Sequence, residues 1–326
     1  MKDLSVLSGL FADHLSTYTA ALSGQKPREL YEPEEYILSL GGKRLRPLLA
    51  LMACEVFNGA PEKALDAALA VELFHNFSLV HDDILDAAPL RRGKETIHTR
   101  WNQNIAILSG DVMLVKSMQV LASYEPELYV ALCKTFQITA VEVCEGQQMD
   151  MNFESTEVVQ VTDYIEMISR KTAVLLGCSL QMGAIIAGTS AENQKLIYEF
   201  GRHLGIAFQL LDDLLDAFAT EDSGFGKQIG GDILANKKTY LLLKAIELAT
   251  AEQKSEIATI LALPPSQEKV VAMLRLYHEL SIAAICRQEA DHHTSSAIAS
   301  LEALPISADH KAALQDFANQ LLNRLY

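Results

Sequence analysis

The amino-acid sequence predicts an all-α fold. Apolar residues recur at helical spacing in almost every segment, and no segment alternates as a half-buried strand does. Of the hairpin dipeptides Asn-Gly and Asp-Gly, only Asn58-Gly59 occurs. Between breaks rich in glycine and proline, the segments run for about 12 to 25 residues, which suits a helical bundle. The breaks lie at Gly41-Gly42, Pro61, Pro89, Pro126, Gly224 to Gly231, Pro264-Pro265 and Pro305.

The composition is that of one soluble globular domain, which we expect to span residues 1–326. Apolar residues make up 49% of the chain and charged residues 21%, and neither repeats nor low-complexity linkers divide it. The net charge of −15 and the lack of a basic tract exclude nucleic acid as a partner. No run of about 18 apolar residues occurs, so we expect no stable membrane insertion. Five scattered cysteines indicate reduced thiols and a cytoplasmic location.

Four segments justify the helical assignment in chain order. In residues 1–22, polar residues interrupt apolar ones, as in an amphipathic helix and unlike a signal peptide. Residues 32–40 form a helix that Gly41-Gly42 ends. Residues 67–80 and 196–211 are apolar on nearly all faces, which predicts two central, buried helices. Each of these two helices runs directly into a cluster of aspartates.

The two aspartate clusters share the form DDxxD and consist of Asp82, Asp83 and Asp86, and of Asp212, Asp213 and Asp216. Residues i and i+4 share a helix face, so each cluster presents two carboxylates to one space. Carboxylates at the C-terminal end of a helix oppose its dipole and repel each other unless a cation is present. An acidic helix end can also be solvated surface, but two identical clusters that each end an apolar helix favour hard cations such as Mg²⁺. Because Mg²⁺ takes few protein ligands, facing clusters suggest several ions that bridge a diphosphate.

Positive charge is scarce, so its placement is informative. Single basic residues are usually solvated, but several lie near glycine breaks, near an aspartate cluster or, in the case of Lys171, just before an apolar helix: Lys43, Arg44, Arg46, Arg91, Arg92, Lys171, Lys227, Lys237 and Lys238. Arginine forks and lysine ammonium groups suit phosphate. His75 lies two helical turns before Asp82, and Gln209 lies three residues before Asp212. Although a lone histidine in an apolar helix is usually a core residue, this alignment favours a diphosphate contact.

These residues make the chain similar to the trans-isoprenyl diphosphate synthases, or polyprenyl synthetases, which include farnesyl and geranylgeranyl diphosphate synthases. The matching segments appear in family order: GGKRLRP (41–47), HDDILD with LRRG (81–86 and 90–93), RKTAVLL (170–176), FQLLDDLLD (208–216), GK (226–227) and NKKTY (236–240). The resemblance implies an isoprenoid synthase helical bundle around a central deep cavity, and a homodimer. It also implies condensation of isopentenyl diphosphate with dimethylallyl, geranyl or farnesyl diphosphate.

By position, the resemblance assigns a role to each matching residue. Asp82, Asp86 and Asp212 resemble the ligands of about three Mg²⁺ ions, and Asp83, Asp213 and Asp216 resemble supporting contacts. The allylic diphosphate is implied to meet Arg91, Lys171, Lys227 and Gln209. The isopentenyl pocket is implied to contain Lys43, Arg46, His75 and Arg92. Lys237 resembles the lysine on the allylic side, and Thr172 the residue beside the reacting carbon. Asn236 replaces the glycine common in that motif, with little expected consequence.

Product length should depend on what blocks the cavity below the first cluster. Phe77 lies five residues before Asp82, Ser78 lies four before it, and Phe74 lies about one turn further away. An aromatic residue with a small neighbour, and no insertion within DDILD, resembles short-chain synthases. A floor built from Phe77 or Phe74 would give a C20 or C15 product. Both residues are ordinary core residues if the floor lies deeper, and a product of C25 or more then follows.

Three other protein classes fit the sequence less well. A class I terpene cyclase needs no isopentenyl pocket, and its second metal motif usually mixes Asn, Ser and Glu. A non-catalytic regulatory subunit of a heteromeric synthase tends to lose an aspartate cluster, and this chain keeps both. A di-iron bundle requires Glu-x-x-His pairs on facing helices, which no suitable segment has.

Overall fold

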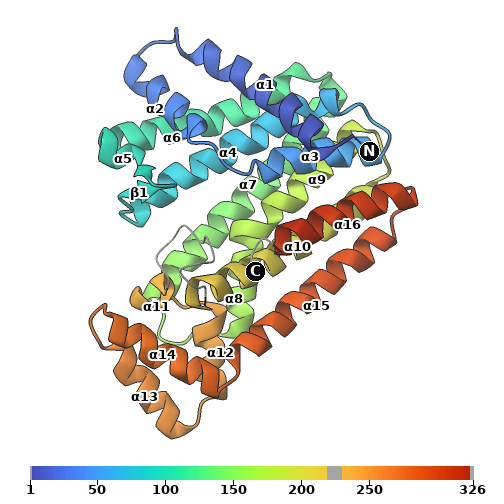
Figure 1. The fold of residues 1–326 in the computed structure, drawn as a ribbon. Helices are drawn as coiled ribbons and strands as arrows, with labels where there is room; N and C mark the ends of the chain where they lie inside the picture. The colour runs from blue at the N-terminus through green and yellow to red at the C-terminus, as the bar shows by residue number, and fades with distance from the viewer. Residues whose placement is uncertain (1, 219–229, 324–326) are drawn as a thin grey trace. The chain divides into compact units, whose positions relative to one another are not determined.

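The computed structural model describes residues 2–218 and 230–323, and these residues are almost entirely helical (Figure 1). The predicted all-α fold is confirmed. The chain divides into two compact units. The first comprises Met1–Ala140, Cys178–Tyr198 and Leu304–His310, and the second Val141–Gly177, Glu199–Ala303 and Lys311–Tyr326. Along the chain, four helices pass from one unit to the other: α7 (Pro126–Ser155), α9 (Val174–Ile186), α10 (Ala191–Phe218) and α16 (Ala308–Asn323).

The first unit is organised around one buried helix. Its other elements are α1 (Leu4–Leu22), α2 (Arg28–Ser39), α3 (Leu45–Val56), η1 (Pro61–Ala64), α4 (Leu65–Leu85), β1 (Leu90–Arg91), β2 (Lys94–Glu95), α5 (Ile97–Arg100), α6 (Gln103–Gln119) and η2 (Val120–Ser123). Helix α4 packs against α6 and α3, and its residues Ala67 to Phe74 are all buried. The predicted central helix over residues 67–80 is therefore confirmed. It places Asp82 and Asp83 in its last turn, with Asp86 as the capping residue.

A short hairpin follows α4 and was missed from the sequence. Strands β1 and β2 are antiparallel, and Arg91 pairs with Lys94. The turn between them consists of Arg92 and Gly93, both with positive φ (53° and 72°), which is the conformation of tight hairpin turns. Two-residue strands are too short to show an alternating pattern, so periodicity could not reveal them.

The second unit contains α8 (Val161–Ile168), η3 (Ser169–Ala173), α11 (Gly231–Leu234), α12 (Tyr240–Leu248), α13 (Ala251–Leu261), α14 (Gln267–Glu279) and α15 (Ile282–Glu302). In it, α12 and α13 pack against α14, and α12 also packs against α15 (Figure 1). Element η3 is one π-helical turn between α8 and α9. Helix α10 is less buried than the sequence indicated, because Glu199, Arg202 and His203 form a half-buried polar stripe on it.

Two histidines face each other between α10 and α15. The Nδ1 atoms of His203 and His293 lie 2.9 Å apart, so at most one of them carries a proton while the contact holds. Burial, together with the neighbouring His203, His292 and Arg202, lowers the pKa of His293 to about 4. Burial also lowers the pKa of His203, although Glu199 beside it acts in the opposite direction. The folded protein therefore favours the neutral forms of this pair.

We expect this pair to make the protein sensitive to acid. Below the unfolded pKa of about 6.5, the unfolded chain binds protons that the folded pair excludes, until the pH reaches the lower folded pKa. The free energy of unfolding then falls by up to about 1.4 kcal/mol per pH unit for each excluded proton. Chemical denaturation at several pH values measures this effect. As the pH falls, the free energy of unfolding should decrease less steeply for His293→Asn than for the wild type or for His278→Asn on α14. Parallel losses in all three proteins would contradict this assignment.

Candidate active site

The first aspartate cluster has one buried member and two that remain accessible. Asp83 is 2% exposed and accepts hydrogen bonds from Nε of Arg91 on both carboxylate oxygens, each at 2.9 Å. Burial raises the pKa of Asp83, and Arg91 opposes that shift. Nη2 of Arg91 lies 4.0 Å from Asp82, whose side chain is 22% exposed. Asp86 caps the helix and is exposed. Asp83 thus ties the hairpin to α4 and leaves Asp82 and Asp86 to present carboxylates one turn apart.

These carboxylates fit a metal that takes further ligands from elsewhere. Among the residues that the structure describes, no group of three or more His, Cys, Asp and Glu side chains could hold a metal ion by itself. Mg²⁺ usually binds one or two protein carboxylates and completes its coordination with phosphate oxygens and water. Asp82 and Asp86 supply donors of that kind and number.

A basic cluster lies in the same unit, where the glycine pair meets α4 and the hairpin. Nη1 of Arg46 donates to Nε2 of His75 at 3.2 Å, which leaves the imidazole proton of His75 on Nδ1. Burial, with the nearby guanidinium groups, lowers the pKa of His75 well below its usual range, so the ring is neutral. Nε of Arg46 is buried and has no hydrogen-bond partner in the described structure. A buried cationic donor without an acceptor is the feature expected of an anion site.

Backbone geometry determines which basic side chains of this cluster remain available to a ligand. Arg92 donates to the carbonyl oxygen of Gly41. A Cβ on Gly42 (φ 138°) would lie 2.8 Å from Nη1 of Arg92, so this approach requires glycine. Arg44 adopts φ 46° before α3 and pairs with the buried Glu72. Arg44 is therefore structural, whereas Lys43 is exposed.

In the second unit, Lys171 and Thr172 lie on the π-helical turn η3. Nζ of Lys171 pairs with Asp150 of α7 at 2.6 Å. Oγ1 of Thr172 lies 3.5 Å from Oε1 of Gln209 on α10. Two glycines allow this turn to approach its neighbours: a Cβ on Gly146 would lie 2.3 Å from the backbone nitrogen of Lys171, and one on Gly205 would lie 2.6 Å from Cα of Ala173. The π turn, a form frequent at functional sites, is thus fixed by close backbone packing.

The second aspartate cluster is more deeply buried than the first. Asp213 is 3% exposed and accepts hydrogen bonds from the Tyr164 hydroxyl and from Nε2 of Gln209, the latter at 3.1 Å. Burial, together with the nearby Asp232, raises the pKa of Asp213 to about 7. Asp216 is 9% exposed and accepts the backbone N–H of Asp232 at 2.9 Å. Of the three aspartates, Asp212 is only half-buried.

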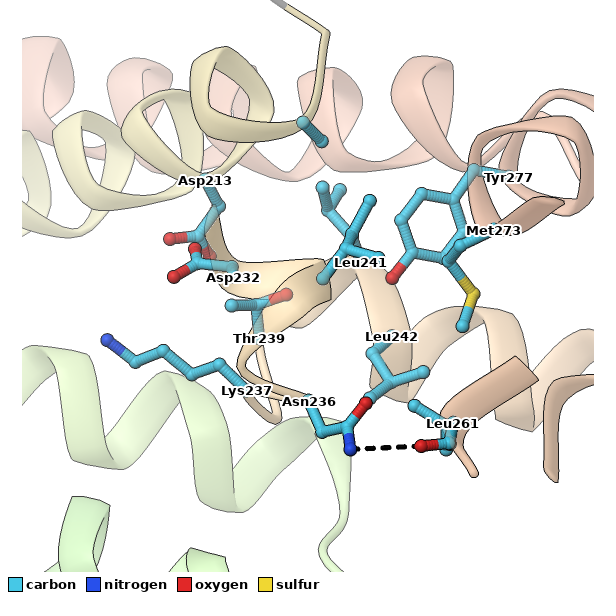
Figure 2. A pocket seen from close by; sticks show the side chains of 12 residues that line it. Asp213, Asp232, Asn236, Lys237, Thr239, Leu241, Leu242, Leu261, Met273 and Tyr277 are labelled. Atoms are coloured by element: carbon cyan, nitrogen blue, oxygen red, sulfur yellow. Dashed lines mark hydrogen bonds between the residues drawn. The ribbon is translucent and has the colours of Figure 1, made fainter. Parts of the chain in front are cut away.

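Figure 2 shows the pocket beside this cluster. The carboxylates of Asp213 and Asp232 point toward each other, and the side chain of Lys237 extends away from the apolar wall formed by Leu241 and Leu242. Lys238, by contrast, donates to the carbonyl oxygens of Phe153 and Thr156 at the end of α7. Of the two lysines, only Lys237 lines the pocket. Lys227, which the resemblance assigns to the allylic diphosphate, lies outside the described residues.

The glycine-to-asparagine difference at residue 236 has a structural explanation. Asn236 has φ 55°, a conformation that asparagine adopts more readily than most residues. Its Nδ2 donates to the carbonyl oxygen of Leu261 at 3.1 Å (Figure 2). The ammonium of Lys269, which is 1% exposed, also donates to this carbonyl, at 3.3 Å. The side chain of Asn236 thus compensates for the strain of the left-handed backbone.

The three residues predicted to limit product length lie together on α4. Phe74 is fully buried and packs edge-on against Phe136 of α7, with ring centroids 5.4 Å apart. Phe77 is 8% exposed, and its ring lies 5.4 Å from that of Phe74 and 4.8 Å from that of His81. The Ser78 hydroxyl donates to the carbonyl oxygen of His75. Phe77 is thus the more accessible of these two aromatic rings, and its role in product length stays a prediction.

Sequence reasoning missed four residues that hold the predicted ones in place: Glu72, Asp150, Tyr164 and Asp232. Asp150 stands in the polar run EGQQMD, and Asp232 follows the glycine-rich stretch, so both carried a weak signal. Glu72 was a single acid within an apolar helix, which indicates a buried ion pair. Tyr164 carried no signal, because its partner Asp213 lies 49 residues away.

Comparison with known proteins agrees with these features. The family model for polyprenyl synthetases matches residues 27–278. A short chain isoprenyl diphosphate synthase of Methanothermobacter thermautotrophicus is 35% identical over 93% of both chains. A crystal structure of a geranylgeranyl pyrophosphate synthase is 44% identical, with a TM-score of 0.93 over 99% of both chains. One of a geranylgeranyl pyrophosphate synthetase from Pyrococcus horikoshii is 34% identical, with a TM-score of 0.89 over 97% of this chain and 98% of that one. The predicted resemblance is confirmed: the chain belongs to the polyprenyl synthetase family.

Proposed function

We propose that this chain condenses isopentenyl diphosphate with an allylic diphosphate to give a short-chain, all-trans prenyl diphosphate, C20 or C15 in length. The observation that carries the proposal is that the first unit contains two kinds of charged group. Asp82 and Asp86 are accessible carboxylates, and in the basic cluster Nε of Arg46 is buried without a hydrogen-bond partner. One set of groups suits a metal-bound diphosphate and the other suits a diphosphate bound directly. The relatives named as short-chain or geranylgeranyl synthases support the product class.

In the proposed function, Asp82, Asp86 and Asp212 serve as metal ligands, and residues 1–326 act as one catalytic domain. Polyprenyl synthetases generally use Mg²⁺. About three Mg²⁺ ions on these aspartates would stabilise the negative charge that develops on the departing diphosphate. The neutral His75 and the guanidinium groups of Arg46 and Arg92 would hold isopentenyl diphosphate. The ammonium of Lys171, paired with Asp150, would contact the allylic diphosphate.

In the proposed reaction, side chains of the protein lie beside the positive charge that develops on the allylic substrate. The allylic carbon–oxygen bond breaks, and the cation forms beside Thr172 and Gln209, whose oxygen dipoles suit positive charge. The isopentenyl double bond then attacks, and the new carbon–carbon bond leaves a tertiary cation. The released diphosphate accepts the proton that this cation loses, so no side-chain base is needed.

A direct assay tests the function. The purified protein is incubated with isopentenyl diphosphate and each allylic starter in turn, with and without Mg²⁺, and product length is measured by mass spectrometry. We expect C15 or C20 diphosphates that form only with the metal. Cyclic hydrocarbon products without consumption of isopentenyl diphosphate would instead indicate a cyclase.

We expect Phe77→Ala to lengthen the product by one or more isoprene units, because it removes the more accessible aromatic ring below the first cluster. Ser78→Ala retains both rings and keeps the side chain at residue 78 small, so it should leave product length unchanged. Assays run well below the melting temperature, since truncation of a buried phenylalanine costs about 3–5 kcal/mol of stability. An unaltered product distribution for Phe77→Ala would remove this residue from the role.

We further propose a cytoplasmic homodimer that buries the outer face of α6. Among the described residues, Gln103–Ser123 has the length and hydropathy of a membrane span, and only 33% of its apolar window is buried within one copy of the chain. Leu108 and Val115 lie two turns apart on α6 and are 56% and 65% exposed. A second copy would cover this surface, since exposed apolar stripes mark interaction sites.

The oligomer is tested by light scattering after gel filtration. We expect the wild type to elute as a dimer and Leu108→Arg to elute as a monomer. Val271→Arg, at a position 59% exposed on α14, is the control and should remain dimeric. A monomeric wild type would exclude this surface as a homodimer interface.

A further inference from the structure

Tyr164 is buried beside the predicted catalytic groups, although no predicted role requires it. It lies on α8, seven residues before Lys171, and is 2% exposed. Its hydroxyl donates to Oδ2 of Asp213 on α10. The other oxygen of the same carboxylate, Oδ1, accepts Nε2 of Gln209 at 3.1 Å. The two bonds engage both oxygens of Asp213, so they fix the plane of its carboxylate.

This arrangement determines which way the Gln209 amide faces. In its ionised form, the Asp213 carboxylate only accepts hydrogen bonds, so it selects the NH₂ group of Gln209 and would repel the amide oxygen. With Nε2 bound to Asp213, Oε1 is directed to the other side, where it lies 3.5 Å from Oγ1 of Thr172. A chain of contacts therefore runs from α8 through α10 to the π turn: Tyr164, Asp213, Gln209 and Thr172.

We propose that Tyr164 is a positioning residue that acts through Asp213 to keep the Gln209 carbonyl oxygen turned toward Thr172 and the reacting carbon. This inference rests on the proposed function, in which that oxygen faces the allylic cation. A dipole that is oriented before the reaction stabilises developing charge without reorganisation, whereas a freely rotating amide has to be ordered in each turnover. Without the Tyr164 hydroxyl, Asp213 can rotate or bind water, and its hold on Gln209 weakens.

The change Tyr164→Phe removes the hydroxyl and keeps the buried ring. We expect kcat to fall about tenfold, as for the loss of one oriented hydrogen bond to a charged group, with little change in KM for isopentenyl diphosphate. Tyr277→Phe is the matched control, because Tyr277 is also a buried tyrosine and lines the pocket that contains Asp213. We expect its kcat to stay within about twofold of the wild type. A ring that matters only for packing would give equal kcat values for both variants.

A double-mutant cycle shows whether Tyr164 acts through Gln209. If it does, Tyr164→Phe lowers kcat in the wild type but causes no further loss in a Gln209→Ala background. Independent losses that multiply would overturn the proposal. Crystal structures supply a readout that does not depend on activity: the Gln209 side chain should leave Asp213 in Tyr164→Phe and stay in Tyr277→Phe. An unmoved Gln209 would refute the positioning role, whereas a wild type without prenyl products would refute only the proposed function.

Discussion

The change Asp82→Asn lowers kcat by at least about 1,000-fold while the protein remains folded. Asp82 stands one turn before Asp86 at the end of α4, and its side chain is 22% exposed, so it can bind an ion that also binds a substrate. An amide of nearly the same shape keeps the packing but loses the charge and one strong oxygen ligand. Removing a group that stabilises charge in the transition state typically costs about 100- to 1,000-fold, and loss of a metal ion costs more.

Stability distinguishes a metal ligand from a structural carboxylate. Asp82 lies near like charges and opposes the helix dipole, and its contact with Arg91 is a loose 4.0 Å. We therefore expect the free energy of unfolding of Asp82→Asn to stay within about 1 kcal/mol of the wild type. Asp83→Asn should behave differently, because it breaks the buried pair with Arg91 and destabilises the fold. The control is Asp13→Asn, on the exposed side of α1. Turnover by Asp82→Asn within tenfold of the control would exclude Asp82 as a ligand.

Local sequence patterns predicted the features that depend on neighbours in the chain. The end of α4, the break at Gly41-Gly42 and the carboxylates one turn apart all follow from residues within one or two helical turns of each other. Such features hold in any fold that keeps the helix, so the sequence is enough to find them.

Features that depend on distant partners were not predicted. Arg44 and Arg46 are two residues apart and chemically identical, yet Arg44 is paired with Glu72, 28 residues away, whereas Arg46 contacts His75. A positive φ at Arg44 separates their directions, and no local pattern signals that conformation in arginine. The Lys171–Asp150 pair likewise spans 21 residues and requires the packing of α7 against the π turn. The sequence thus identified which residue types matter, and the fold determines which of them are available to a ligand.

That packing makes Gly146 sensitive to substitution. A methyl group at this position would lie 2.3 Å from the backbone nitrogen of Lys171 and 2.7 Å from its Cα. Backbone atoms cannot turn aside as a flexible side chain can, so α7 and η3 must separate by about 1 Å. We expect Gly146→Ala to lower the free energy of unfolding by about 1–3 kcal/mol and kcat by about 100-fold, since a displacement of 1 Å misplaces Lys171 and Thr172.

A control substitution at a glycine whose added Cβ would meet no other atom separates this steric effect from the effect that alanine has in any helix. Gly9 lies in α1, and a Cβ there meets nothing within 4 Å. Gly9→Ala should stabilise the protein by about 0.5–1 kcal/mol through helix propensity alone and leave kcat unchanged. Because both substitutions add the same methyl group to a helix, the difference between them measures the steric cost at the π turn. Thermal melts and initial rates for the two variants decide the matter: if Gly146→Ala behaves like Gly9→Ala, the close approach of α7 does not hold the catalytic segment in place.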